Sequence, residues 1–308
     1  MRYFGLLIFI QFCLTLSAQK TGIELGIVHW GRDLDKAKSL AKQTDKPILL
    51  FFQEVPGCQT CKNFGSEVMS DPLIAEYIET YFIPVLVYNN KGGVDAKILQ
   101  SYGEPSWNNP VLRVIKSDGK DLIQRNSGKY DAGSIIAYLN SAVLASGRLV
   151  PGYALLLEEE YDARTSECVL EMYCFWSGEK TIGHLPGVIS TTAGFSKGHE
   201  VVKVVYDPGK TNLQSLLKSA SKSGNADRIY TSKAHELEIA NKLKIPTYTG
   251  NFDFKKDKEV HYYLVKSKYA GIKMTEMQAT KVNAAIGNGL DPKNYLSPKQ
   301  LLCVDNRL

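Results

Sequence analysis

Cysteine is scarce in this sequence: its 308 residues include six, far too few for a scaffold stapled together by disulfides. Neither sign of charge dominates, since 32 acidic residues oppose 37 basic ones without any block of like charge, so nucleic acid is not an expected partner. Past the first twenty residues, no apolar stretch approaches the roughly 20 residues that span a bilayer as a helix. Cysteine and histidine do not cluster at ligand spacing, so we expect no metal and no other cofactor.

The first eighteen residues have the pattern of an export signal. Met1-Arg2 supplies a positive start, the segment 3–17 is mostly apolar, and the small residue Ala18 occupies the expected cleavage position. An uncleaved anchor is the alternative, although the apolar run is only about fifteen residues long, short for a membrane span. We therefore expect residues 1–18 to be a signal peptide and the mature protein to be periplasmic or secreted, without a membrane span.

The rest of the chain reads as two α/β domains. Alternating strands and helices predict a layered sheet domain over 24–146, followed by a linker over 147–163 and a second domain with a C-terminal tail over 164–308. In the first domain, strands are expected at 48–52, 83–88 and 109–115, the last paired with 121–125, and helices at 33–44, 72–81 and 131–145. A helix is expected at 153–163, and in the second domain strands at 167–173, 187–194 and 200–206 and helices at 211–221, 232–243 and 274–286.

Cys58 and Cys61 form a CxxC motif directly after the apolar strand 48–52 and at the start of a helix. Unpaired N–H groups and the positive end of the helix dipole stabilise a thiolate at such a position, and two intervening residues allow the second thiol to close a disulfide. A zinc site and a static structural disulfide are the alternatives, but zinc needs further ligands nearby. The motif therefore favours redox chemistry by Cys58 and Cys61.

This half resembles the thioredoxin superfamily over about 24–146. The resemblance rests on the strand-CxxC-helix arrangement and on Asn109-Pro110, where members of the family carry a cis-proline that faces the disulfide. It implies a thioredoxin-like fold, thiol–disulfide chemistry and a substrate-facing role for Pro110. The segment Val55-Pro-Gly-Cys-Gln-Thr-Cys61 departs from the family's usual Trp-Cys-Gly-Pro-Cys, so the reduction potential does not carry over.

Cys174 also follows a strand and precedes a helix, with Phe175 and Trp176 as its neighbours. A single thiol activated at a helix N-terminus, beside two aromatic rings, suggests attack on a substrate that carries a small apolar group. Three common core residues in a row are the alternative, and composition alone favours that core packing.

A series of short motifs around Cys174 resembles peptide methionine sulfoxide reductase A over about 165–265. In order, they are Cys174-Phe-Trp, Leu185-Pro-Gly-Val188, Ser190-Thr-Thr-Ala-Gly-Phe195, Gly198-His-Glu-Val-Val202 and Val205-Tyr-Asp-Pro208. The resemblance implies a ferredoxin-like α/β sandwich in which Cys174 is the nucleophile and Phe175 and Trp176 hold the substrate methyl group. It further implies that Glu200 protonates the sulfoxide oxygen, because a sulfoxide oxygen leaves poorly until it is protonated. Asp227 and Tyr230 would be pocket residues, and the substrate would be oxidised methionine in proteins or peptides.

Attack would leave Cys174 as a sulfenic acid, which a second thiol must resolve. We expect Cys303, near the C-terminus, to do so from a mobile tail. Cys168 is the alternative, but six residues of strand place it roughly 20 Å away. A third route has Cys58 attack Cys174 directly.

Several positions depart from the reductase pattern. Tyr173 stands where the family has glycine before the nucleophile, and Phe195 replaces a tyrosine. The segment between Phe195 and Gly198 is much shorter than usual. These differences would reshape the pocket and leave the nucleophile and the acid in place.

The sequence thus predicts an exported peptide methionine (S)-sulfoxide reductase that a fused thioredoxin-like dithiol regenerates, with electrons from an upstream thiol–disulfide reductant. A tethered dithiol meets its partner at an effective concentration near millimolar. The alternative is a thiol–disulfide oxidoreductase whose second domain is a catalytically weakened protein-binding module.

Overall fold

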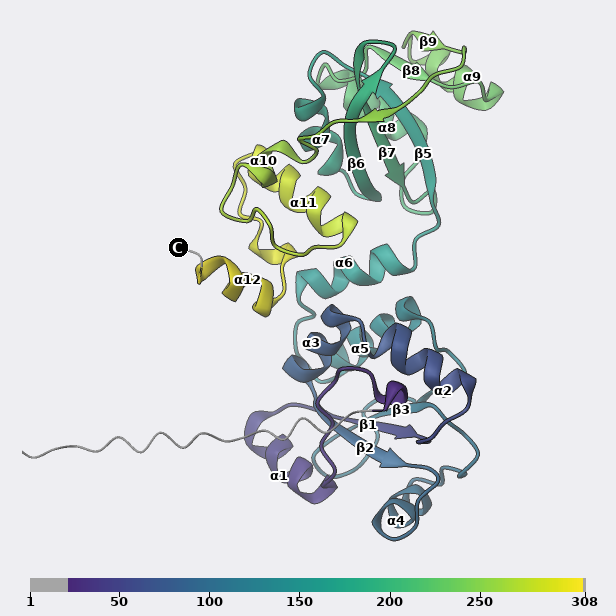
Figure 1. Ribbon diagram of the computed structural model, residues 1–308, viewed down its shortest axis with the longest axis vertical. Helices are drawn as coiled ribbons and strands as arrows, with labels where there is room; N and C mark the ends of the chain where they lie inside the picture. The colour runs from purple at the N-terminus through teal and green to yellow at the C-terminus, as the bar shows by residue number, and fades with distance from the viewer. Residues whose placement is uncertain (1–21, 307–308) are drawn as a thin grey trace, which may run out of the picture.

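The computed structural model describes residues 22–306, which form two α/β units with helix α6 (Gly152–Tyr161) between them (Figure 1). The signal peptide expected at 1–18 lies outside the described residues. Among residues 22–306, no helix has both the length and the apolar character needed to cross a membrane.

The N-terminal unit is built on a four-stranded mixed sheet in the order β2-β1-β3-β4. Its strands are β1 (Ile48–Gln53), β2 (Ile83–Tyr88), β3 (Val111–Ile115) and β4 (Asn126–Ser127). The central strand β1 pairs parallel with β2 and antiparallel with β3, and all six of its residues are buried. A continuous apolar strand is therefore covered on both faces, as the sequence predicts.

Helices lie on both faces of this sheet. The side chains of Leu50 and Phe52 pack with α1 (Leu34–Thr44) and α4 (Val94–Ser101), whereas Leu49 and Phe51 pack on the opposite face. The helices on that opposite face are α2 (Gln59–Asn63), continued by the π-helical turn Phe64–Val68, then α3 (Pro72–Tyr81) and α5 (Ala132–Ala145). The short helix η1 (Ile23–Leu25) precedes α1.

Two local expectations fail in this unit. The strand expected at 121–125 is wrong, because Asp121 forms only a single bridge with Ile115 and the strand beside β3, on the side away from β1, is β4. Helix α4 has no counterpart among the helices expected from the sequence.

The C-terminal unit holds a six-stranded sheet in the order β10-β6-β7-β5-β8-β9. Its strands are β5 (Ser166–Glu171), β6 (Val188–Ser196), β7 (His199–Tyr206), β8 (Arg228–Tyr230), β9 (Thr247–Tyr248) and β10 (Lys255–Lys256). One face packs against α7 (Phe175–Gly183) and α8 (Leu213–Lys222) in a core that contains Leu170, Ile182, Val202 and Leu216. The remaining helices are α9 (Ala234–Lys242), α10 (Tyr262–Val265), α11 (Glu276–Gly287), η3 (Lys293–Tyr295) and α12 (Pro298–Asp305). Both units are mixed α/β, as predicted.

Helix α6 falls within the expected linker, yet it is part of two cores. Its residues Tyr153, Ala154 and Leu157 are buried in the core of the N-terminal unit. Leu156 packs with Ile189 and Met277 of the C-terminal unit. The helix therefore joins the two units by burial and not only by chain connection.

The C-terminal segment, expected to be a mobile tail, forms a helix that packs against the N-terminal unit. Residues Pro298–Asp305 form α12, which Ser297 begins with a capping box. The Ser297 hydroxyl donates to Glu76 Oε2 of α3 (2.7 Å) and the N–H of Lys299 donates to Glu76 Oε1 (2.6 Å). Because Glu76 and Ser297 are both buried, α12 is fastened to the N-terminal unit.

Candidate functional site

The two cysteines of the CxxC motif have different environments. Cys58 is the exposed N-cap of α2, Cys61 is fully buried, and their Sγ atoms lie 3.3 Å apart. The N–H of Cys61, in the first turn of the helix, lowers the pKa of Cys58, with a smaller contribution from Thr60. Burial raises the pKa of Cys61 to about 12, and its contact with Cys58 adds to the effect. The lowered pKa and exposure of Cys58 fit the prediction that it is the attacking thiol, with Cys61 as its protonated partner.

The peptide bond Asn109-Pro110 is cis, which confirms the sequence expectation. Asn109 brings its own side chain to the dithiol, because the Cys61 thiol donates to Asn109 Oδ1 at 2.7 Å. The buried carboxylate of Glu24 accepts from the N–H of Gly57 (3.0 Å), and Gln53 Nε2 donates to the Glu24 carbonyl oxygen. Sequence reasoning missed the roles of Glu24, Gln53 and Asn109, because Glu24 and Asn109 are far from the motif along the chain.

Gly57 is needed where it stands. A Cβ at this position would lie 2.6 Å from both Cys61 Cβ and the Glu54 carbonyl oxygen. Only glycine lets the backbone approach the second cysteine this closely.

Cys174 occupies the N-cap position of α7 and is partly exposed. Glu200, on β7, reaches the same helix end: its Oε2 accepts from the N–H of Phe175 at 2.9 Å. The partly buried Glu200 carboxyl group is therefore held at the helix end that begins at Cys174. This places two of the predicted residues together.

Helix α7 is capped by charge at both ends. At its C-terminal end, Lys281 Nζ donates to the carbonyl oxygens of Gly183 (3.0 Å) and Leu185 (2.7 Å). Burial lowers the pKa of Lys281 to about 8. A carboxylate at the start of a helix and a lysine at its end both oppose the helix dipole. The helix that begins at Cys174 is thus fixed from β7 and from α11.

Aromatic rings surround the start of α7. The Phe175 ring lies 5.5 Å from Trp176 and 5.3 Å from Phe195, measured between centroids. Trp176 stacks on Tyr262 at 4.1 Å with an interplanar angle of 17°. Within residues 22–306, the buried indole N–H of Trp176 has no hydrogen-bond partner. Tyr173 projects into solvent, 91% exposed. Sequence reasoning missed Tyr262.

The structure places Tyr230 on the other side of the sheet from Glu200, whereas the pocket role of Asp227 stays a prediction. The Tyr230 hydroxyl donates to Glu171 Oε2 at 2.6 Å, and the N–H of Asp227 donates to the Glu171 carbonyl oxygen. Glu171 is paired with Val201, so its side chain points to the face opposite that of Glu200. The structure therefore does not bring Tyr230 together with Glu200, and its place in the pocket stays a prediction.

The other two cysteines of the second half lie in contrasting places. Cys168 is buried in β5, and burial raises its pKa to about 12, which makes it a poor attacking thiol. Cys303 is exposed on α12 and lines a cleft of about 900 Å³ between the two units, together with Ile27, Glu79 and Met274. Cys174 is not among the described residues that line this cleft. The resolving role of Cys303 stays a prediction.

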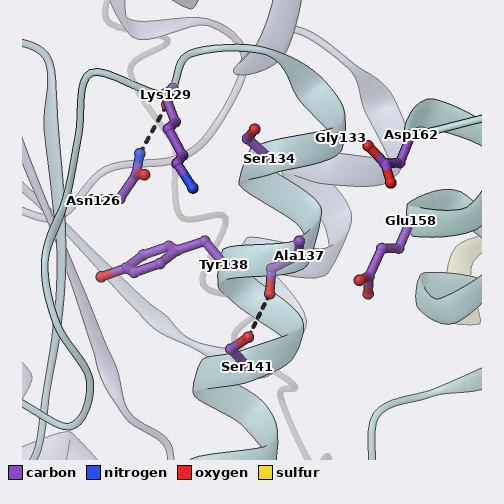
Figure 2. A pocket seen from close by; sticks show the side chains of 9 residues that line it. All are labelled: Asn126, Lys129, Gly133, Ser134, Ala137, Tyr138, Ser141, Glu158 and Asp162. Carbon is purple, nitrogen blue, oxygen red and sulfur yellow. Dashed lines mark hydrogen bonds between the residues drawn. The ribbon is translucent and has the colours of Figure 1, made fainter.

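Figure 2 shows a second cavity, of about 310 Å³, between α5 and the end of α6. Polar side chains line it, among them Lys129, Glu158 and Asp162, and none of its lining residues is a predicted site residue. Within the described part of the chain, no three histidine, cysteine or acidic side chains gather as metal ligands.

The fold and the paired thiols define the class of the first unit. Residues 29–116 match the family model described as thioredoxin-like, and the N-terminal unit is a thioredoxin-like domain. A solved structure titled DsbH oxidoreductase has a TM-score of 0.34 and 20% identity, and the match covers 41% of this chain and 92% of that one.

The chain is also similar to peptide methionine sulfoxide reductases. It is 38% identical to "Peptide methionine sulfoxide reductase MsrA 1" of Rhizobium meliloti, an alignment that covers 20% of this chain and 37% of the relative. It is 32% identical to the peptide methionine sulfoxide reductase MsrA of Photobacterium profundum, with the same coverage of 20% and 37%. This chain thus spans little more than a third of the length of these curated relatives.

Proposed function

We propose that this protein is an exported peptide methionine (S)-sulfoxide reductase, regenerated by its own thioredoxin-like domain. The single observation that carries the proposal is the meeting of Cys174 and Glu200 at the N-terminus of α7, where Glu200 Oε2 accepts from the N–H of Phe175 at 2.9 Å. The similarity to curated methionine sulfoxide reductases supports the same chemistry. The substrate would be oxidised methionine in proteins or peptides.

In the first step, the Cys174 thiolate attacks the sulfoxide sulfur while Glu200 gives a proton to the sulfoxide oxygen. Oxygen passes from the substrate to the cysteine, so methionine leaves and Cys174 becomes a sulfenic acid. Cys174 attacks from the N-terminal end of α7, and the Phe175 and Trp176 rings offer an apolar surface for the methyl group.

In the second step, a dithiol reduces the sulfenic acid. Two thiols supply two electrons and two protons, which yields a disulfide, water and the Cys174 thiol. Cys58 and Cys61 are suited to this step, because Cys58 is exposed with a lowered pKa while Cys61 keeps its proton. Cys303, exposed on α12, is the proposed resolving thiol, and direct attack by Cys58 is the alternative route. An upstream thiol–disulfide reductant would then recharge the pair.

The proposal is tested by incubating the full chain with dabsyl-methionine sulfoxide and dithiothreitol and measuring dabsyl-methionine. We expect turnover that Cys174→Ser abolishes and that Cys168→Ser, the matched control, retains. With an upstream protein reductant as the sole electron source, Cys58→Ser should complete one stoichiometric round and then stop. Turnover by Cys174→Ser equal to that of the wild type would refute the proposal.

The second candidate is a thiol–disulfide oxidoreductase whose C-terminal domain binds client proteins. The observation that favours it is the hydrogen bond between Tyr230 and Glu171, which keeps a predicted pocket residue on the face opposite Glu200. This candidate predicts disulfide exchange by Cys58 and Cys61 with no methionine product from dithiothreitol assays.

A further inference from the structure

Helix α7 contains a second carboxyl group that the proposed chemistry does not use. Glu179 lies five residues after Cys174, and its side chain is completely buried. Its Oε1 accepts from the N–H of Ala193 on β6 (3.0 Å), and its Oε2 accepts from the N–H of His261 (2.9 Å). Burying a carboxyl group is costly, and burial indeed raises the pKa of Glu179 to about 7. Because burying the Glu179 carboxyl group costs free energy, we expect its role to lie in what its two hydrogen bonds hold in place.

The segment that Glu179 holds leads straight to the aromatic site. His261 has a positive φ of 58°, and its Nε2 lies 2.9 Å from the Thr191 carbonyl oxygen. The next residue, Tyr262, begins α10 and stacks on Trp176. The hydrogen bond to Glu179 therefore fixes the backbone immediately before the ring that covers Trp176.

The stacked ring limits the space next to Trp176. At a centroid distance of 4.1 Å and an angle of 17°, two rings are in van der Waals contact and leave no room between them. One face of the indole is therefore closed to a substrate group, and the Phe175 centroid lies 5.5 Å from that of Trp176. The Phe195 ring in turn packs against Phe175, at 5.3 Å between centroids.

We propose that Glu179 is a positioning residue which, through the main chain at His261, holds Tyr262 on Trp176 and thereby restricts the sulfoxide pocket to a methyl-sized group. This inference rests on the proposed reductase function and deepens it by naming the residues, Glu179 and Tyr262, that would set the discrimination between methyl and longer alkyl sulfoxides. Excluding one additional methylene from an apolar pocket discriminates by about 10–200-fold.

The test compares methionine sulfoxide with ethionine sulfoxide, with dithiothreitol as the reductant so that recycling by Cys58 and Cys61 is not needed. For the wild type, we expect kcat/KM for the ethyl compound to be at least about tenfold lower. Tyr262→Ala should bring the two values within about threefold, mainly through KM. Tyr262→Phe keeps the stacked ring and should keep the discrimination.

Glu179→Gln tests the positioning role. The amide retains one acceptor oxygen and turns an NH₂ group toward the other N–H, so the His261 segment should loosen and discrimination should fall partway toward that of Tyr262→Ala. Glu259→Gln is the matched control, because Glu259 lies on the same segment but pairs with Lys266 in a partly exposed ion pair. It should leave the ratio unchanged.

The outcomes separate the two proposals. A wild type that forms no methionine refutes the reductase function itself. A wild type that reduces methionine sulfoxide, together with a Tyr262→Ala variant whose ethyl-to-methyl ratio is unchanged, overturns only the inference about Glu179 and Tyr262. If Glu179→Gln does not fold, Tyr262→Ala and Tyr262→Phe still decide between these results.

Discussion

Glu200 is the side chain on which the proposed chemistry depends most. Its Oε2 is bound to the N–H of Phe175, which fixes the carboxyl group at the helix end where Cys174 lies. We predict that Glu200→Gln lowers kcat for methionine sulfoxide reduction by about 10²–10⁴-fold, the usual contribution of a general acid. Steady-state assays with dithiothreitol measure this loss. The control is Glu167→Gln, an exposed carboxylate on neighbouring β5, and an equal loss in both variants would contradict the role of Glu200.

The two thiols of the CxxC motif should differ in reactivity. The pKa of Cys58 is lowered at the helix N-terminus, whereas burial raises the pKa of Cys61 to about 12. We predict that iodoacetamide modifies Cys58 at neutral pH, more slowly as the pH falls, while Cys61 stays unmodified up to about pH 10 because the thiolate is the reactive form. Peptide mapping of the reduced protein over time measures both rates. Modification of Cys61 at the rate of Cys58 would show that burial does not govern the pair.

Glu179 should couple stability to pH. Its native pKa of about 7 is above its ordinary value of 4.5, so between these values the native state binds more protons than the unfolded state. The contribution of Glu179 to the free energy of unfolding is therefore complete below about pH 4.5 and is lost as the pH rises through 7. We predict that urea unfolding curves show the wild type gaining stability relative to Glu179→Gln on going from about pH 8 to about pH 5.5. A constant difference between the two proteins over this range would contradict the titration.

At the scale of elements, helix α7 packs closely against the sheet at Gly178. A Cβ at Gly178 would overlap Met172 Sδ and would come within 3.3 Å of Val202. We predict that Gly178→Ala destabilises the C-terminal unit by about 1–3 kcal/mol, as overpacked cores do. Chemical denaturation monitored by circular dichroism measures the change. Gly198→Ala is the contrast, since open space surrounds that position, although its positive φ carries a separate cost. A Gly178→Ala variant as stable as the wild type would show that α7 can shift.

Local periodicity predicts most elements, because an apolar strand such as β1 or an amphipathic helix such as α1 reveals its buried face within a few residues. It misplaces the partner of β3, since the turn after Lys116 leads to one bridge at Asp121 before the chain pairs again at Asn126. It identifies α6 as a helix, but a sequence does not reveal that different faces of one helix are buried by different partners.

The site residues likewise divide into those that local sequence predicts and those placed by long-range contacts. Cys58 and Cys61 can be predicted because the motif is local, whereas the cis bond before Pro110 is expected only through the resemblance to the thioredoxin superfamily. Cys174 and Glu200 can be paired only through the resemblance to a family. The face on which Tyr230 lies follows from the register of β8 on β5, and Tyr262 reaches Trp176 from 86 positions further along the chain (262 − 176). Such long-range placements are not encoded in a short window of sequence.

For the molecule as a whole, the contact of α12 with Glu76 should hold the units together. Removing the carboxyl group leaves the buried Ser297 hydroxyl and the N–H of Lys299 without their acceptor, at a cost of about 1–3 kcal/mol. We predict that Glu76→Ala speeds hydrogen exchange in α12, as measured by mass spectrometry. Glu79→Ala should have a much smaller effect, because Lys299, its ion-pair partner, is largely exposed. Equal protection in Glu76→Ala and the wild type would mean that other contacts hold α12.

Helix α6 determines how this protein can be taken apart for study. Cutting the chain on either side of residues 152–161 would strip one half of a helix that completes its hydrophobic interior: Tyr153 and Leu157 for the first half, Leu156 for the second. A truncated half expressed alone would present that bare apolar surface to water and would tend to aggregate. The contributions of the two halves are therefore best separated by point substitutions in the intact chain.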